Sequence, residues 1–187
     1  MEPARFAEVF DRHYQAILRY LRRRIGPDLA DDLAAETFTL AFRRRHQYRG
    51  EHADAAAWLY GIAANLLRQH ARAEVRRLRA YARVVPDPVG PDIGDGVAER
   101  VDTAAAGRRA ALAVADLPAN QREVLLLFAW AELDYVGIAR ALDVPEGTVR
   151  SRLHRARRRL RRQLGLTEVT GQPGLLAPTP PGRSDPA

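Results

Sequence analysis

The sequence predicts an all-α protein in which a flexible linker joins two small helical domains. Apolar residues recur at steps of three or four along most of the chain, the spacing of a helix that buries one face. No stretch alternates apolar and polar residues as a half-buried strand would. Composition changes sharply near the middle, which sets the expected domains at residues 1–83 and 103–166, a linker at 84–102 and a disordered tail at 167–187.

The N-terminal block predicts three helices. The first should end at Gly26-Pro27, because glycine caps a helix and proline cannot continue one. A second helix is expected at about 28–46 and a third at about 54–83, with a loop between them. The apolar face of the first helix consists of Phe6, Phe10, Tyr14, Ile17, Leu21 and Ile25.

The linker and the C-terminal block follow. Residues 85–96 hold three prolines, three glycines and three aspartates, which is too little apolar surface to order the segment. Helical periodicity resumes from about residue 103 and breaks at Leu117-Pro118. Residues 134–162 then read as a short helix, a turn at Asp143 and a very basic second helix, the pattern of a helix-turn-helix. The expected apolar contacts between these two helices are Ile138, Leu142, Val144, Val149 and Leu153.

Charge indicates a polyanionic partner. The chain of 187 residues carries a net charge of +7, and all 30 of its basic residues are arginine. Arginine forks suit phosphates and guanine edges, so DNA is the expected partner. No acidic residue occurs from Gly147 to Thr167, which makes this helix-turn-helix pattern more specific than its apolar spacing alone.

Several other classes of protein are disfavoured. The chain has no cysteine, which excludes disulfides and thiolate-bound zinc, and its five histidines lack zinc-ligand spacing. We find no nucleophile elbow, phosphate-cradling loop or catalytic dyad, so we expect no enzyme activity, no cofactor and no metal. We also expect no membrane insertion and a cytoplasmic location, because no apolar run approaches about 18 residues and the N-terminus is too acidic for a secretory signal.

With both blocks in view, the chain resembles the extracytoplasmic-function (ECF) group of bacterial RNA polymerase sigma factors. In the N-terminal block the matching segments are 31–38 (DDLAAETF) and 58–65 (WLYGIAAN), with Arg72 following. In the C-terminal block they are 117–125 (LPANQREVL) and 147–157 (GTVRSRLHRAR). These segments look like sigma regions two and four, in the family's order.

The resemblance implies a function and its site residues. A sigma factor binds core RNA polymerase and promoter DNA, and an anti-sigma factor is a further partner that the family leads us to expect. Docking on the clamp helices of the largest polymerase subunit would involve Asp31, Asp32, Leu33, Glu36 and Phe38. Capture of the melted minus-ten strand would involve Tyr48, Arg49, Asn65, Arg68 and Arg72. The minus-thirty-five duplex would be read by Thr148, Arg150, Ser151, Arg152, His154 and Arg155 in the first turns of the recognition helix.

Two other functions fit part of the sequence. A dimeric helix-turn-helix regulator would explain the basic helix but not the motifs between Asp31 and Arg72. A metal-dependent helical enzyme would explain the paired aspartates Asp31 and Asp32 but not the basic helix. Some of these residues also fit a purely structural role. Asp31, Asp32 and Glu36 fit a solvated helix N-terminus, where acidic side chains interact favourably with the helix dipole. Trp58 fits a core residue.

Overall fold

The described residues of the computed structural model, 1–48, 55–84 and 95–166, form eight α-helices and no strand. The all-α fold predicted from periodicity is therefore confirmed. Arg49, the middle of the expected linker and the expected tail lie outside these residues. The helices are α1 (Pro3–Ile25), α2 (Pro27–Arg43), α3 (Ala55–Gln69), α4 (Ala71–Val84), α5 (Asp95–Ala115), α6 (Ala119–Trp130), α7 (Tyr135–Leu142) and α8 (Glu146–Leu164).

The turn between α1 and α2 follows the predicted chemistry. Gly26 ends α1 with a φ of 97°, a conformation that strains any residue with a side chain. Its N–H donates to the carbonyl of Arg22, and Pro27 begins α2 directly afterwards. Glycine followed by proline thus reverses the chain direction without a loop.

Two helix boundaries differ from the expectation. The predicted third helix is divided at His70, whose N–H bonds to the carbonyl of Leu67 at 2.9 Å, three residues back instead of four. This tighter turn separates α3 from α4. In addition, α5 begins at Asp95, inside the segment expected to be linker.

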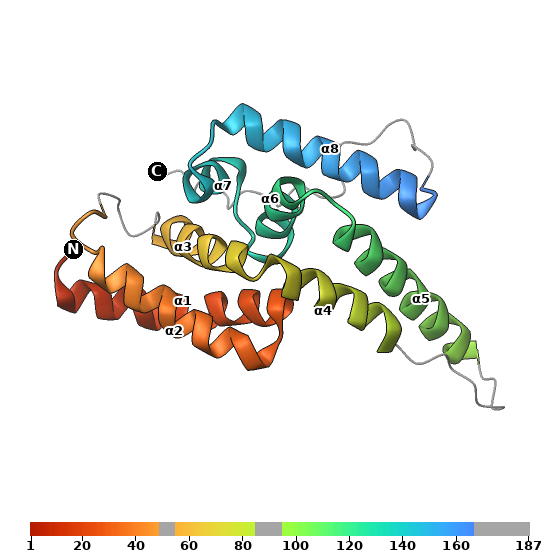
Figure 1. The fold of residues 1–187 in the computed structure, drawn as a ribbon, viewed down its shortest axis with the longest axis horizontal. Coiled ribbons are helices and arrows are strands. Elements are labelled where there is room, and N and C mark those ends of the chain that lie inside the picture. The colour runs from red at the N-terminus through yellow and green to blue at the C-terminus, as the bar shows by residue number, and fades with distance from the viewer. Residues whose placement is uncertain (49–54, 85–94, 167–187) are drawn as a thin grey trace, which may run out of the picture.

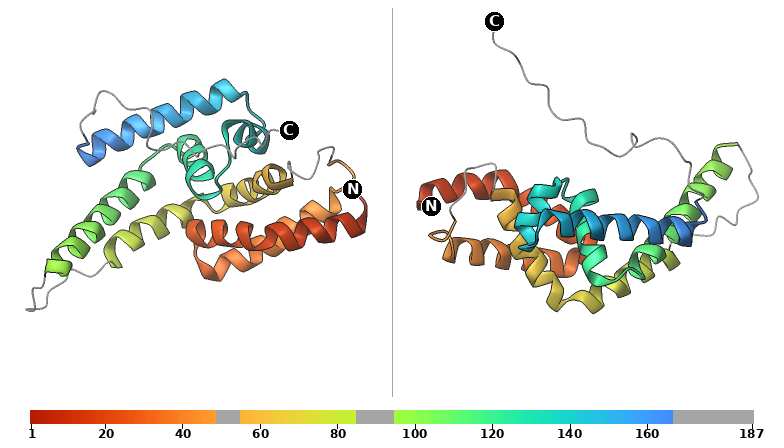
Figure 2. Two further views of the ribbon diagram at one scale, coloured as in Figure 1. Left: turned by 180° about the vertical axis from the view of Figure 1, so that it is seen from behind. Right: turned by 90° about the horizontal axis from the view of Figure 1, so that it is seen from above.

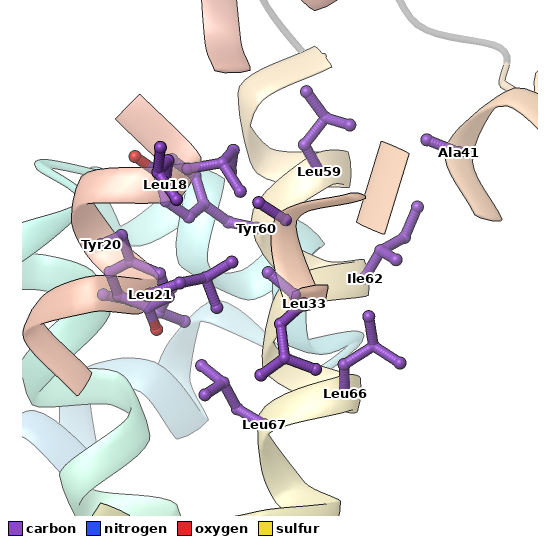
Figure 3. Close-up of a cluster of buried hydrophobic side chains, with 14 of the residues drawn as sticks. Leu18, Tyr20, Leu21, Leu33, Ala41, Leu59, Tyr60, Ile62, Leu66 and Leu67 are labelled. Carbon is purple, nitrogen blue, oxygen red and sulfur yellow. The ribbon is translucent and has the colours of Figure 1, made fainter. Parts of the chain in front are cut away.

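The core of the N-terminal block lies where α1, α2 and α3 meet. Figure 3 shows side chains of these three helices converging on one another. The helix α3 is buried on most sides, with alanine at positions 55, 57, 63 and 64 allowing neighbouring helices to approach it. The larger buried residues of this core are Leu18 and Leu21 of α1, Leu33 of α2, and Leu59, Ile62, Leu66 and Leu67 of α3.

The two blocks pack against each other (Figure 1). The helix α7 lies on α3, and α5 runs beside α4. Both views in Figure 2 place α7 beside α3 and α5 beside α4, and α8 packs on α5, α6 and α7. The buried apolar cluster is continuous across this boundary, since it includes Val124, Leu127 and Ile138 together with the core of the N-terminal block.

The closest approach in this contact is made by Gly61 of α3. A Cβ atom placed on Gly61 would lie 2.5 Å from the backbone oxygen of Ala141 in α7. Backbone atoms cannot move aside as a flexible side chain can, so only glycine fits at this position in the packed arrangement.

Candidate nucleic-acid interface

The turn between α7 and α8 has the geometry of a helix-turn-helix. The Asp134 carboxylate caps α7 by accepting a hydrogen bond from the N–H of Gly137 at 2.7 Å. Asp143 ends α7 with a φ of 51°, as predicted for an aspartate in the left-handed turn. Ile138 of α7 and Val149 and Leu153 of α8 are fully buried between the helices, so the outer face of α8 is held rigidly.

The first turns of α8 carry polar side chains outward. Arg150, Ser151, His154 and Arg155 are exposed, whereas Thr148 and Arg152 are half-buried at the edges of this face. Arg150 forms an ion pair of 2.6 Å with Glu146, and Arg155 donates to the carbonyl and hydroxyl oxygens of Ser151 at 3.2 Å. These contacts orient both guanidinium groups along the exposed face of α8.

The last turns of α8 continue the positive surface. Exposed arginines occupy positions 158, 159, 161 and 162. Arg157 is half-buried and lies 5.0 Å from the ring centre of Phe128 in α6, which ties the basic helix to its support. This second surface has arginine without the serine and histidine of the first turns.

A second group of candidate residues follows α3 into α4. Asn65, Arg68 and Arg72 are exposed. Asn65 and Arg68 are three residues apart in α3 and share one side of that helix, and Arg72 follows in the first turn of α4. Tyr48 packs on Trp58 with ring centres 5.0 Å apart, and both rings are half-buried. Trp58 therefore combines a packing role with an accessible edge next to the segment that contains Arg49, which lies outside the described residues.

The polymerase-docking candidates on α2 divide into two groups. Asp31, Asp32 and Glu36 are exposed, and Asp31 pairs with Arg22 of α1 at 2.9 Å. Leu33 and Phe38, in contrast, are each only 4% exposed and belong to the core. The expectation that these two side chains supply apolar contact to a partner needs correction, since both are buried in the core and hold α2 in place.

A buried polar cluster that the sequence did not predict lies between the two blocks. Arg24 of α1 donates to Glu74 of α4 at 2.5 Å and to Glu123 of α6 at 2.6 Å, and all three are at least nine-tenths buried. Arg122 of α6 reaches Glu74 at 3.3 Å. The Tyr20 hydroxyl donates to Glu123 at 3.3 Å and accepts from Arg24.

Electrostatics in this cluster follow from its burial. Burial raises the pKa of the Tyr20 phenol far above its usual range, so this group remains a neutral hydrogen-bond donor. Burial alone would lower the pKa of Arg24, but Tyr20, Glu123 and Glu74 outweigh that effect and raise it. One sequence signal was available: Arg24 stands in the apolar stripe of Ile17 and Leu21, where a solvated arginine would not be expected.

Within residues 1–48, 55–84 and 95–166, no group of three or more histidine, aspartate or glutamate side chains is arranged to hold a metal ion. No helix in the same part of the chain is both long and apolar enough to cross a membrane.

Comparison with known families identifies the two blocks. Residues 9–77 match Sigma-70 region 2, and residues 108–160 match Sigma-70, region 4. The first match covers α3 and the acidic helix α2, and the second covers the helix-turn-helix of α7 and α8. The chain therefore belongs to the sigma-70 family of transcription initiation factors.

Individual relatives narrow the assignment within that family. The chain is 35% identical to the RNA polymerase sigma factor HrpL of Pseudomonas syringae pv. syringae over 155 residues, which cover 80% of this chain and 82% of HrpL. It is 33% identical to the ECF sigma factor SigM of Mycobacterium tuberculosis, covering 86% of this chain and 77% of SigM. It is also 30% identical to the ECF sigma factor SigW of Bacillus subtilis, covering 85% and 88%. The protein is an ECF sigma factor, which directs promoter-specific initiation of transcription.

Solved structures share the fold. The sigma factor RpoE, in complex with the anti-sigma factor NepR from Bartonella quintana, aligns with a TM-score of 0.56 over 87% of this chain and 98% of RpoE, at 22% identity. The structure of CnrH in complex with the cytosolic domain of CnrY aligns with a TM-score of 0.57 over 88% of this chain and 90% of CnrH, at 21% identity.

Proposed function

We propose that this sigma factor divides promoter recognition between two surfaces and has no catalytic activity of its own. Residues 1–83 would serve core polymerase and the minus-ten element, and residues 103–166 the minus-thirty-five element. The observation that carries this proposal is the exposed face of α8, which combines arginine, serine and histidine on a helix whose opposite face is buried.

The minus-thirty-five duplex is assigned to the first turns of α8. An α-helix fits the major groove of B-DNA, where arginine can make two hydrogen bonds to guanine. Arg150 and Arg155 are the proposed base readers, supported by Ser151 and His154 on the same exposed face. Thr148 and Arg152, which are half-buried, would contact the backbone at the edges of the groove.

The minus-ten element is assigned to the surface around the α3–α4 junction. A base removed from the stack needs a hydrogen-bonding group such as the Asn65 amide, and the flanking strand needs positive charge such as Arg68 and Arg72 supply. Tyr48 and Arg49 are assigned to the same melted strand. This assignment favours a melted single strand over a duplex, because aromatic and amide groups bind unstacked bases.

Core polymerase is assigned to the acidic face of α2. The exposed carboxylates Asp32 and Glu36 lie one turn apart and would meet the clamp helices of the largest subunit. An anti-sigma factor is a further proposed partner, since RpoE was solved in complex with the anti-sigma factor NepR. A protein that acts on RNA polymerase would work in the cytoplasm.

One experiment separates this proposal from its rivals. The full chain should co-purify with core polymerase and should then support transcription that depends on a promoter sequence. A dimeric regulator would instead bind duplex DNA without polymerase and would fail to initiate transcription with core enzyme alone. Transcription by core polymerase without added protein is the control, and equal transcription with and without the protein would overturn the proposal.

A further inference from the structure

A cavity of about 560 Å³ lies between α1, α4, α5 and α6, and it is partly open to solvent. None of the residues that line it is assigned above to DNA or to polymerase. Its volume falls within the range of roughly 300–1,000 Å³ that is typical of small-molecule sites. Side chains in folded proteins normally pack with few voids larger than a water molecule, so a space of this size is unusual for a small helical domain.

The walls of the cavity are almost entirely apolar. One wall is α5, where Gly107, Ala110 and Ala111 present little or no side chain. A Cβ atom placed on Gly107 would meet no atom within 4 Å, so the space in front of this residue is open. The other walls include Leu78 of α4 and Trp130 of α6. An apolar chain that displaces water from this space removes its own surface and that of the walls from water, which favours binding.

Two guanidinium groups belong to the same lining. Arg23 comes from the last turn of α1 and Arg77 from α4, and both side chains are exposed. Arg77 reaches the end of α1, since its Nη1 atom would be 3.0 Å from a Cβ atom placed on Gly26. Within the part of the chain that the structure describes, no aspartate or glutamate lines the cavity, and neither arginine forms an ion pair or a hydrogen bond.

Neighbouring arginines on the same two helices are paired, which distinguishes them from the two that line the cavity. Arg24 of α1 contacts Glu74, and Arg79 of α4 contacts Asp116. The C-terminal end of α1 carries a partial negative charge that favours nearby cations, but it does not replace a carboxylate. Two guanidinium groups beside an apolar cavity therefore offer a site for the head group of an anion.

We propose that this cavity binds an amphipathic anion, an acyl chain that ends in a carboxylate. The chain would lie along the small residues of α5, and the carboxylate would accept hydrogen bonds from Arg23 and Arg77. A planar guanidinium group can donate two hydrogen bonds to one carboxylate, which favours this head group over a neutral one. The site goes beyond promoter recognition, and it does not depend on the residues assigned to DNA.

Decanoate is the probe for this site, and the full chain is the receptor. Isothermal titration calorimetry should show saturable binding of decanoate to a single site. Butyrate has the same head group on a shorter chain, and decanol has the same chain without the charge. Each should bind at least about tenfold more weakly than decanoate, because each lacks one of the two contributions to binding.

Two changes test the two parts of the site. Arg23→Gln with Arg77→Gln removes both cations, and Gly107→Leu fills the open space beside α5 with an apolar side chain. The double replacement should weaken decanoate binding by at least about tenfold, since the carboxylate loses its charged donors. Gly107→Leu should weaken it by a similar factor, since the acyl chain loses its space.

Each change has a matched control on the same helices. Arg12→Gln with Arg76→Gln removes the same charge from exposed positions of α1 and α4 that do not line the cavity. Ala106→Leu adds a leucine side chain to α5 at the exposed position next to Gly107. Both controls should bind decanoate as the unaltered protein does.

A brominated decanoate locates the bound probe, because bromine quenches the fluorescence of a tryptophan that it contacts. Trp130 lines the cavity, whereas Trp58 lies in α3 and does not. Since the sequence has two tryptophans, Trp58→Phe leaves Trp130 as the reporter, and Trp130→Phe leaves Trp58. We expect quenching of Trp130 and none of Trp58.

Three results would overturn the proposal. The first is the absence of saturable decanoate binding by the unaltered protein. The second is unchanged binding by either cavity variant with helix content intact by circular dichroism. The third is equal quenching of both tryptophans, which would indicate adsorption to the surface. If a cavity variant loses helix content, the comparison of decanoate with butyrate and decanol on the unaltered protein decides instead, and equal binding of the three would overturn the site.

Discussion

Individual arginines on α8 should differ in what they contribute to binding. Arg150 and Arg155 lie in the first turns, so replacing either with alanine should cost roughly 1–3 kcal/mol and relax the preference at one or two minus-thirty-five positions. Their partners Glu146 and Ser151 are surface groups, so both side chains can leave these contacts at little cost to reach a base. Binding to a library of minus-thirty-five duplexes measures the effect.

Arg158 and Arg161 are the matched comparison because they are exposed further along the same helix. Replacing either should weaken all sequences alike and reduce the slope of log affinity against log salt by at most about one unit. Repeating the library measurement at two salt concentrations separates the two classes. An unchanged preferred sequence in Arg150→Ala and Arg155→Ala would show that this face is not the reading surface.

Asn65 provides a second prediction for a single residue. Asn65→Ala should impair open-complex formation and discrimination at the minus-ten element, because the proposed pocket loses its amide. Duplex binding at minus-thirty-five should be unchanged, since that surface lies on α8. Asn120→Ala, which removes an exposed amide from α6, serves as the control. Equal losses at both promoter elements would indicate misfolding of the variant.

At the scale of one element, the proposed binding of core polymerase to the acidic face of α2 can be tested by reversing its charge. The double reversal Asp32→Arg with Glu36→Arg should abolish detectable core binding while helix content stays the same, because both carboxylates are exposed and outside the core. The same change of charge on α1, Glu8→Arg with Asp11→Arg, is the control. Co-purification with core polymerase is the measurement, and normal binding by the α2 variant would contradict the assignment.

Helices and turns were predictable where neighbouring residues determine them. Gly26 and Asp143 both adopt the positive φ that their residue types indicated. The break at His70 was missed because no glycine or proline marks it and apolar periodicity continues across it. The start of α5 at Asp95 was missed because Asp-Gly composition there favours a turn over a helix.

At the scale of the whole molecule, contacts between the regions escaped prediction altogether. Arg24 is 50 residues from Glu74 and 99 from Glu123 in sequence, and helical periodicity carries information only over a few turns. The same limit explains why the burial of Leu33 and Phe38 was not predicted. Their motif indicated a binding helix, but the burial of each side chain depends on how α2 packs against its neighbours.

The continuous core also predicts how the molecule unfolds. Each region holds one tryptophan, Trp58 in α3 and Trp130 in α6, so Trp130→Phe and Trp58→Phe give reporters of one region each. Both reporters should show the same urea midpoint because the regions share one apolar cluster. Adding Glu123→Arg should separate the two midpoints, whereas Asp116→Asn should leave them together. Different midpoints without Glu123→Arg would show that the regions unfold independently.

Because every basic residue is arginine, few chemical modifications can change the charge of the α8 surface. Lysine loses its charge on acetylation, but the chain has no lysine, so the positive face of α8 cannot be neutralised in that way. Methylation of arginine, in turn, leaves the charge of the guanidinium group in place. The positive charge that α8 offers to DNA phosphates is therefore not removed by either modification of a basic side chain.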